Sequence, residues 1–475
     1  MYSVGNRLKI SLFGKSHNEC IGCIIEGLPY GMEIDFDNIQ RMMDLRKPSA
    51  GIGTPRKEAD AVIFEEGVTD GKVTGRYVLL RIPNTNKNSS AYSGFNITPR
   101  PGHADLPALM KFKDFDVSGG AQFSGRMTAP LVAAGAIARQ YLQSRGIGIA
   151  AYTKSIYDIV DETDRTFEEI SRSTNYKTRA ASADLDSRMT ECIMEASKEE
   201  DSVGGIVECM VTGLPIGMGG IWFDALDVTV ARLMFSIPAV KGVEFGKGFG
   251  ITAMKGSESN DQYSIRDRRI TATSNNMGGV CGGMSNGMPL TFDVAFKPTP
   301  SIGKRQRTVD IQKMRDANIE IKGRHDPCIV PRAVVVVEAM AAIAVMDQYL
   351  CDQELRSLQL HQRELGHVVL VVLHVLVVEI KAVMLPCVPP ANGGGALGKL
   401  SAGEHLRSVC RVLALHELGP GIEPPEIVLR LHEGLNMGHQ RGHLVILVPL
   451  EYAMMDRGPH QVQFLQVPDA QLGYA

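Results

Sequence analysis

The sequence predicts an α+β fold for residues 1 to about 350, and three observations support this prediction. Short apolar or alternating runs, typical of β-strands, recur along the chain between turn-forming residues. Three longer runs have the patterning of helices. A turn sequence occurs twice, as GLPYGM from Gly27 and as GLPIGM from Gly213, each time after a strand-like run. Either two related halves pack about a pseudo-twofold axis, or one turn sequence has been used twice by chance.

The expected elements follow from local patterns. Strands are expected at Arg7–Phe13, Ile21–Glu26, Tyr77–Ile82, Gly205–Thr212 and Leu290–Phe296. Thr128–Arg145 is apolar and alanine-rich and is followed by Gly146, which favours a helix ending there. Asp184–Lys198 has acidic residues early and a lysine late, which suits a helix dipole. Ala333–Leu350 is almost wholly apolar, so we expect a helix that is covered on all sides.

The composition changes near Cys351 and divides the chain into residues 1–350 and 351–475. The second part has only two lysines but nine of the chain's 12 histidines. It is either an appended domain with its own role or an unnatural extension, such as translation in a shifted reading frame. The extension is the favoured interpretation, because neither a recognisable site nor a coherent amphipathic pattern is present. We therefore expect an irregular or disordered tail.

The overall composition excludes several classes of partner. The chain is 44% hydrophobic and 22% charged with a net charge of −3, so binding to nucleic acid or to a membrane surface is not expected. Among nine cysteines only Cys20 and Cys23 form a CxxC pair, and buried free thiols are expected rather than a metal site. The first residues lack the apolar stretch of a signal peptide, which predicts a cytoplasmic protein.

Histidines are the first indication of chemistry. Only three occur before residue 351, in the segments FGKSHNECIG, PRPGHADLP and KGRHDPC, which all read as loops. Histidine titrates near neutrality, glycine lets a ligand approach the backbone, and arginine supplies a fixed positive charge. Loops with this composition favour a site that binds polyanions and moves protons.

Two glycine-rich segments suit an anion, although each has a structural alternative. Asn276–Pro289 precedes a strand that ends in FKPTPS, where a lysine and two hydroxyls could contact a phosphate, or the glycines could simply form tight turns. Ser118–Pro130 leads into a helix, where free N–H groups attract anions, or Ser124 or Thr128 merely caps the helix. Neither a dinucleotide fingerprint, a P-loop, a GxSxG nucleophile nor a cluster of metal ligands is present in the sequence.

Over roughly residues 3 to 350 the chain resembles the chorismate synthase family. The segments FGKSH…GLP, SGRMTAP…AAGAIA and GRHDPCIVPRAVVVVEAM are similar to the three signature segments of the family, in the same order. Further segments that resemble the family are RPGHAD, SIPAVKGVEFG, KGSESND, GGVCGGMSNG and FKPTPSI. The resemblance implies a compact β-α-β sandwich that assembles into homotetramers.

The resemblance also implies a reaction. 5-Enolpyruvylshikimate 3-phosphate would lose phosphate from C3 and a proton from C6 in an anti-1,4-elimination, giving chorismate for aromatic amino acid biosynthesis. The family requires reduced FMN although no net redox change occurs, and some members reduce their own flavin, so NAD(P)H is a candidate external reductant. The C6 hydrogen is poorly acidic, which explains why an electron-rich cofactor would supply the difficult chemistry.

Matching positions imply roles for individual residues. His17 would protonate the departing phosphate, His103 would favour the monoanionic reduced flavin, and Asp326 would act with flavin N5 in a proton relay. The implied substrate ligands are Arg46, Arg100, Arg126 and Arg324. The implied FMN ligands are Ser124, Ala239, Gly282, Lys297, Pro298, Thr299, Pro300, Ser301 and Arg324. No metal is implied.

The sequence departs from the family pattern at several positions, which are Lys15, Asn18, Ile52 and the Gln122-Phe123 pair. Since the proton-transfer residues are kept, we expect the reaction to be kept as well. Two other functions are weighed against it. One is an FMN-dependent oxidoreductase with net hydride transfer, and the other is a flavin- or phosphate-binding protein made inactive by its tail.

Overall fold

The structure, a computed structural model, describes residues 2–49, 51–53, 59–85, 94–321 and 326–384. The chain divides into two compact units, Met1–Leu376 and Val377–Ala475. The fold and the site described below belong to the first unit. The predictions made for the tail beyond Met384 lie outside the described residues.

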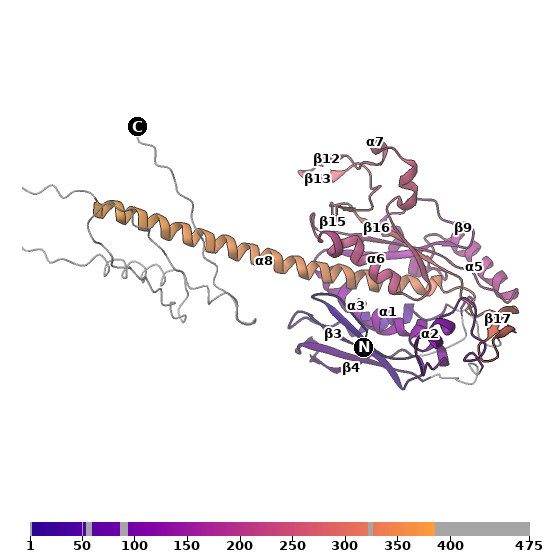
Figure 1. Cartoon of the computed structure of the whole chain (residues 1–475). Coiled ribbons are helices and arrows are strands. Elements are labelled where there is room, and N and C mark those ends of the chain that lie inside the picture. The colour runs from indigo at the N-terminus through magenta and orange to yellow at the C-terminus, as the bar shows by residue number, and fades with distance from the viewer. Residues whose placement is uncertain (1, 50, 54–58, 86–93, 322–325, 385–475) are drawn as a thin grey trace, which may run out of the picture. The chain divides into compact units, whose positions relative to one another are not determined.

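Two five-stranded antiparallel sheets form the framework (Figure 1). The first has the order β1-β2-β3-β7-β4, with bounds Tyr2–Val4, Lys9–Gly14, Cys20–Glu26, Tyr77–Pro83 and Ile63–Glu66. The second has the order β11-β16-β10-β8-β9, with bounds Val240–Phe245, Leu290–Phe296, Gly205–Thr212, Gly148–Ile156 and Ile159–Val160. The five predicted strands are confirmed, two of them with the predicted bounds, whereas the long strand β8 was not foreseen.

The remaining described elements are α-helices, short 3₁₀ turns and two-stranded hairpins. The α-helices are α1 Phe36–Leu45, α2 Asp105–Lys111, α3 Thr128–Ser144, α4 Phe167–Ser171, α5 Ala183–Lys198, α6 Leu226–Ser236, α7 Gly256–Ser259 and α8 Val330–Met384. Short 3₁₀ turns are Ser118–Phe123, Gly125–Met127, Ser173–Asn175, Trp222–Asp224 and Gly248–Ala253. Two-stranded hairpins are β5–β6 (Val68–Thr69, Lys72–Val73), β12–β13 (Tyr263–Arg266, Arg269–Ala272), β14–β15 (Val280–Cys281, Met284–Ser285) and β17–β18 (Gln306–Asp310, Arg315–Ile319). All three predicted helices are present, but α8 continues beyond its predicted end at Leu350.

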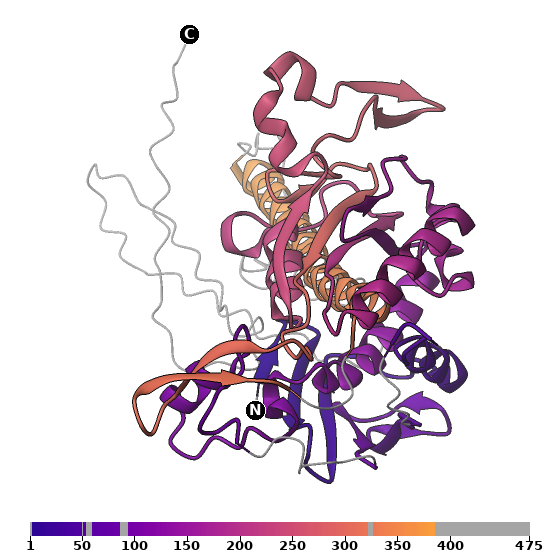
Figure 2. The ribbon, with the colours of Figure 1, turned by 90° about the vertical axis from the view of Figure 1, so that its right-hand side faces the viewer.

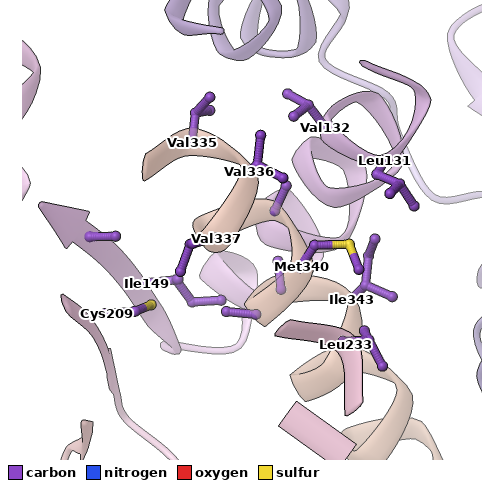
Figure 3. Close-up of a cluster of buried hydrophobic side chains, with 14 of the residues drawn as sticks. Leu131, Val132, Ile149, Cys209, Leu233, Val335, Val336, Val337, Met340 and Ile343 are labelled. Carbon is purple, nitrogen blue, oxygen red and sulfur yellow. The ribbon is translucent and has the colours of Figure 1, made fainter. Parts of the chain in front are cut away.

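The first part of α8 and the whole of α3 form the middle layer, as two orthogonal views show (Figures 1 and 2). Side chains of α8 face α3 on one side and strands β8 and β10 on the other (Figure 3). The segment Val330–Gln359 is long and apolar enough to cross a membrane, but 83% of its most apolar stretch is buried inside the protein. A helix that is apolar on all faces needs such cover, so this is a core helix, as the sequence predicts.

Two buried acids of α8 connect the helix to the sheets. Glu338 accepts a hydrogen bond from the backbone N–H of Ala151 in β8 at 2.9 Å, and burial raises its pKa. Asp347 accepts hydrogen bonds from the backbone N–H groups of Asn6, Arg7 and Leu8 at 2.6–3.0 Å. Because these groups lie in the turn between β1 and β2, the carboxylate of Asp347 satisfies donors that no strand partner reaches.

Gly135 of α3 allows the two central helices to approach closely. A Cβ atom at this position would lie 2.4 Å from Cβ of Ala339 in α8. Replacing Gly135 with valine is therefore expected to lower the free energy of unfolding by about 1–3 kcal/mol, the usual cost of overpacking a core. Urea denaturation measures the change. Gly256→Ala is the control, because nothing lies within 4 Å of a Cβ atom there, and equal stability of both variants would contradict close helix packing at Gly135.

The repeated turn occupies equivalent places in the two sheets. Gly27 follows β3 and Gly213 follows β10, with φ angles of +87° and +80°. Gly31 and Gly217 also have positive φ angles, of +76° and +80°. In both halves the turn leaves the central strand of a five-stranded sheet and a helix follows, α1 or α6. The pseudo-twofold repeat is therefore part of the architecture, and chance reuse of a turn sequence does not explain it.

Candidate active site

A cavity of about 710 Å³ lies where the predicted loops converge. Its walls come from the end of α1, the loop before α2, the glycine-rich segment before α3, the segment between α6 and β11, the end of β16 and the start of α8. A volume of this size is in the usual range for small-molecule sites. These six segments are far apart in the sequence, so the cavity exists only because the two halves of the fold pack together.

Positive charge dominates the cavity wall. The charged side chains among the described lining residues are Arg46, Arg100, Lys241, Lys297, Arg332 and a single acid, Asp326. Burial, together with the nearby Lys241, lowers the pKa of Lys297. Arg46, Arg100 and Arg332 are each paired with a carboxylate, of Asp60, Asp105 and Asp326, whereas the two lysines are close enough to disfavour each other's charge. The electrostatics therefore favour a ligand with more than one negative charge.

Two of the predicted histidines lie beside two adjacent glycines in the segment before α3. Gly119 and Gly120 have φ angles of +61° and +74°, in the left-handed region that favours glycine. A Cβ atom on Gly119 would lie 2.5 Å from Nε2 of His17, and one on Gly120 would lie 3.5 Å from Nε2 of His103. The backbone N–H of Ser16 donates to the carbonyl of Ala121 at 3.3 Å, which fixes the loop that carries His17.

His103 is oriented by a buried carboxylate. Asp105 is fully buried at the start of α2, and its Oδ1 lies 2.6 Å from Nδ1 of His103. Arg100 donates to both carboxylate oxygens, at 2.7 and 2.9 Å. Burial alone would raise the pKa of Asp105, but hydrogen bonds from Arg100 and then His103 outweigh it and lower the pKa. With Nδ1 engaged in this way, Nε2 of His103 is the ring atom next to Gly120 and the cavity.

A second buried acid, Asp60, joins two of the predicted arginines. Its Oδ2 accepts from Nη1 of Arg46 at 2.9 Å, and its Oδ1 accepts a short hydrogen bond from Nη1 of Arg126. Arg46 also donates to Thr128 Oγ1 and to the carbonyl of Gly125. All three charged side chains are at most 6% exposed. Asp60 therefore neutralises part of the charge behind the cavity wall and fixes the orientation of Arg46.

The end of β16 and the start of α8 meet at Asp326. Thr299 Oγ1 donates to the backbone carbonyl of Asp326 at 2.7 Å, and Arg332 Nη1 donates to Asp326 Oδ2 at 2.5 Å. On the same wall, Ser301 Oγ accepts from Arg100 Nη1 at 3.2 Å. Ala239 has a φ angle of +75°, unusual for a residue with a Cβ atom, and its carbonyl accepts from the N–H of Lys297.

Most of the predicted site residues line this cavity. They are Arg46, Arg100, His103, Ser124, Ala239, Lys297, Thr299, Pro300, Ser301 and Asp326. His17 lies against Gly119, whose backbone forms part of the wall. Three others are not lining residues: Arg126 is held in the Asp60 cluster, Pro298 lies between two lining residues, and Gly282 is in the turn between β14 and β15. Arg324 lies outside the described residues.

Sequence reasoning assigned no role to four residues that complete the arrangement, namely Asp60, Asp105, Lys241 and Arg332. Asp105 was visible in the segment RPGHAD beside the predicted histidine, and this spacing was the available signal. Lys241 lies in the family-like segment SIPAVKGVEFG. Arg332 lies in the family-like segment GRHDPCIVPRAVVVVEAM, whereas no local pattern distinguishes Asp60 from an ordinary loop residue.

The residues that depart from the family pattern lie at the surface, in the core and on the cavity wall. Lys15 pairs with Asp116 at 3.5 Å at the surface, and the side chain of Asn18 is exposed. Ile52 is buried in the main core. Gln122 and Phe123 both line the cavity, and the ring of Phe123 packs 5.8 Å from that of Phe115. Among the described residues there is no group of three or more metal-ligating side chains.

Fold and site together are typical of an enzyme that acts on a small molecule, in a cavity lined mainly by cationic side chains between two related antiparallel sheets. The family model for chorismate synthase matches residues 8–350. The chain belongs to the chorismate synthase family, which confirms the resemblance seen in the sequence.

Relatives named chorismate synthase match most of the first unit. The chain is 44% identical over 347 residues to one from Dehalococcoides mccartyi, a match that covers 73% of this chain and 95% of the relative. It is 40% identical over 367 residues to one from Methanobrevibacter smithii, with coverages of 76% and 99%. A solved structure titled as the crystal structure of chorismate synthase matches with a TM-score of 0.59 at 26% identity, covering 74% of this chain and 93% of that chain.

Proposed function

We propose that this chain is a lyase that converts 5-enolpyruvylshikimate 3-phosphate to chorismate by anti-1,4-elimination of phosphate. The observation that carries the proposal is the cavity itself, which is lined by five cationic side chains and one acidic side chain. A substrate with a phosphate and two carboxylates offers the charge that such a wall requires. Family membership supports the same function, and nothing in the comparisons favours the oxidoreductase or the inactive binding protein.

The residues of the cavity fit reduced FMN as the cofactor. Gly120 has no side chain to obstruct a planar ring beside Nε2 of His103, and Lys297 and Lys241 offer charge for a phosphate. Residues Ser124, Ala239 and Lys297–Ser301 would hold the cofactor, together with Arg324 and Gly282 by family resemblance. Reduced FMN, when bound, would supply electron density as the C–O bond breaks and a basic ring nitrogen for the C6 proton.

The protein groups would orient the substrate and move protons. Arg46 and Arg100 would hold its anionic groups, since guanidinium forks bind phosphate and carboxylate in fixed orientations. Arg126 would act on the substrate only indirectly, through Asp60 and Arg46. His17 would give a proton to the departing phosphate, which leaves more readily when protonated. His103 would favour the monoanionic form of the reduced flavin, and the carboxylate of Asp326 would take part in the proton relay.

Assembly and location follow the family as proposals. We expect a homotetramer in the cytoplasm, with residues 1–350 as the catalytic domain and residues 351–475 as an extension that takes no part in the reaction. NAD(P)H would serve only to keep the flavin reduced, directly or through another protein.

An anaerobic turnover assay tests the proposed function. With photoreduced FMN and the substrate, the proposal predicts release of one phosphate per chorismate formed, with the flavin still reduced at the end. Stoichiometric loss of flavin electrons would instead establish an oxidoreductase. Binding of flavin without either change would establish an inactive binding protein.

A further inference from the structure

Arg332 occupies a position from which it can control the geometry of Asp326. It lies in the first turn of α8, six residues after Asp326, and lines the same cavity. Its Nη1 donates to Asp326 Oδ2 at 2.5 Å. The two side chains are 26% and 13% exposed, so the pair lies at the cavity wall, where water screens it only in part.

Two contacts of the backbone around Asp326 are separate from the contact that its carboxylate makes with Arg332. The carbonyl of Asp326 accepts from Thr299 Oγ1 at 2.7 Å, and the carbonyl of Pro327 accepts from the N–H of Val203 at 2.9 Å. Neither contact restricts the carboxylate. The hydrogen bond from Arg332 does restrict it, because a charge-assisted contact favours one orientation of the planar group.

Arg332 also joins two parts of the site. Its Nε donates to the backbone carbonyl of Arg46 at 3.2 Å. One guanidinium thus links Asp326, in the segment between β18 and α8, to Arg46, at the end of α1. Within the described part of the chain no hydrogen bond engages Nη2 of Arg332, so this donor is available to a ligand in the cavity.

We propose that Arg332 is a positioning residue, which orients the Asp326 carboxylate for proton transfer and sets its distance from the Arg46 segment. This inference rests on the proposed role of Asp326. A merely structural ion pair would affect stability alone, whereas a positioning residue affects the chemical step more than substrate binding.

The test compares Arg332→Ala and Arg332→Lys with the wild-type chain in the anaerobic phosphate-release assay. We expect Arg332→Ala to lower kcat about 10- to 100-fold, the range for loss of a charge-assisted hydrogen bond, with a much smaller change in KM. Lysine places one point charge where arginine places a fork, so Arg332→Lys should keep part of the lost activity. Arg145→Ala, which removes an exposed arginine in contact only with Tyr141, is the control and should match the wild type.

Chemical rescue distinguishes a positioning role from a structural one, because guanidinium should restore kcat only if Arg332 acts on Asp326. Guanidinium ion added at millimolar concentration should restore kcat of Arg332→Ala at least fivefold, and sodium at the same ionic strength should not. Thermal unfolding of the flavin-free protein shows whether each variant is folded. If Arg332→Ala does not fold, the folded Arg332→Lys variant decides, and a wild-type kcat for it would overturn the proposal.

The outcomes separate this inference from the function on which it rests. An unchanged kcat in both Arg332 variants, or a folded Arg332→Ala that guanidinium fails to rescue, overturns the role of Arg332. Full activity of Asp326→Asn would instead remove Asp326 from the mechanism. Absence of phosphate release in the wild-type chain would reject the proposed function itself.

Discussion

Replacing His17 with alanine is expected to lower the turnover number about 100-fold or more, the usual scale for a lost general acid. His17 lies in the loop after β2, and its ring packs against Gly119 at the cavity wall. The backbone contact between Ser16 and Ala121 holds this loop in place without the imidazole. The fold should therefore survive the substitution, and the loss should appear in the step that releases phosphate.

The matched control for this experiment is Asn18→Ala. Asn18 lies in the same loop, but its side chain is exposed, and its backbone makes the hydrogen bonds, to Lys15 and from Asn84. Steady-state phosphate release under anaerobic conditions measures both variants. Equal turnover in His17→Ala and Asn18→Ala would remove His17 from the mechanism.

Replacing Asp105 with asparagine is expected to reduce both stability and turnover. The substitution leaves the buried guanidinium of Arg100 without its bidentate partner and gives His103 an amide in place of a carboxylate. Breaking a buried ion pair by removing one partner costs about 3–5 kcal/mol of unfolding free energy. Turnover should fall as well, because Asp105 holds the ring of His103 beside Gly120.

The effect of Asp105→Asn should depend on pH in a defined direction. The pKa of Asp105 is lowered in the folded protein, so its contribution to stability is complete above the pKa of the unfolded chain, about 4. The contribution is lost as the pH falls below that value. Denaturation at pH 7 and at pH 3 should therefore show a large difference between variant and wild type at pH 7 and a smaller one at pH 3. The same difference at both values would contradict the ionised carboxylate.

Local patterns in the sequence predicted the central strands and helices well. Strands β10 and β16 alternate or are apolar over their whole length, and α3 ends next to Gly146, so their bounds follow from short-range rules. Strand β8 was missed because it is buried on both faces for most of its length and lacks alternation. The close approach of α3 and α8 at Gly135 depends on Ala339, about 200 residues away, and no local pattern shows it.

The sequence motifs predicted most residues of the candidate site, but they did not predict the residues that support them. Glycine, histidine and arginine in loops indicated where an anion could bind, and most of those residues line one cavity. Asp60 could not be found in this way, because it lies 14 residues after Arg46 and 66 residues before Arg126, and only the fold brings the three together. Arg332 lies in a family-like segment, but only the structure shows its contact with Asp326.

The central claim is that one cationic cavity takes up the phosphorylated substrate and the reduced flavin together. Anaerobic titration of the chain with dithionite-reduced FMN, with and without saturating substrate, measures this directly by the change in flavin absorbance. We predict saturable uptake of one flavin per chain that tightens when the substrate is present. No uptake in the presence of saturating substrate would contradict the claim.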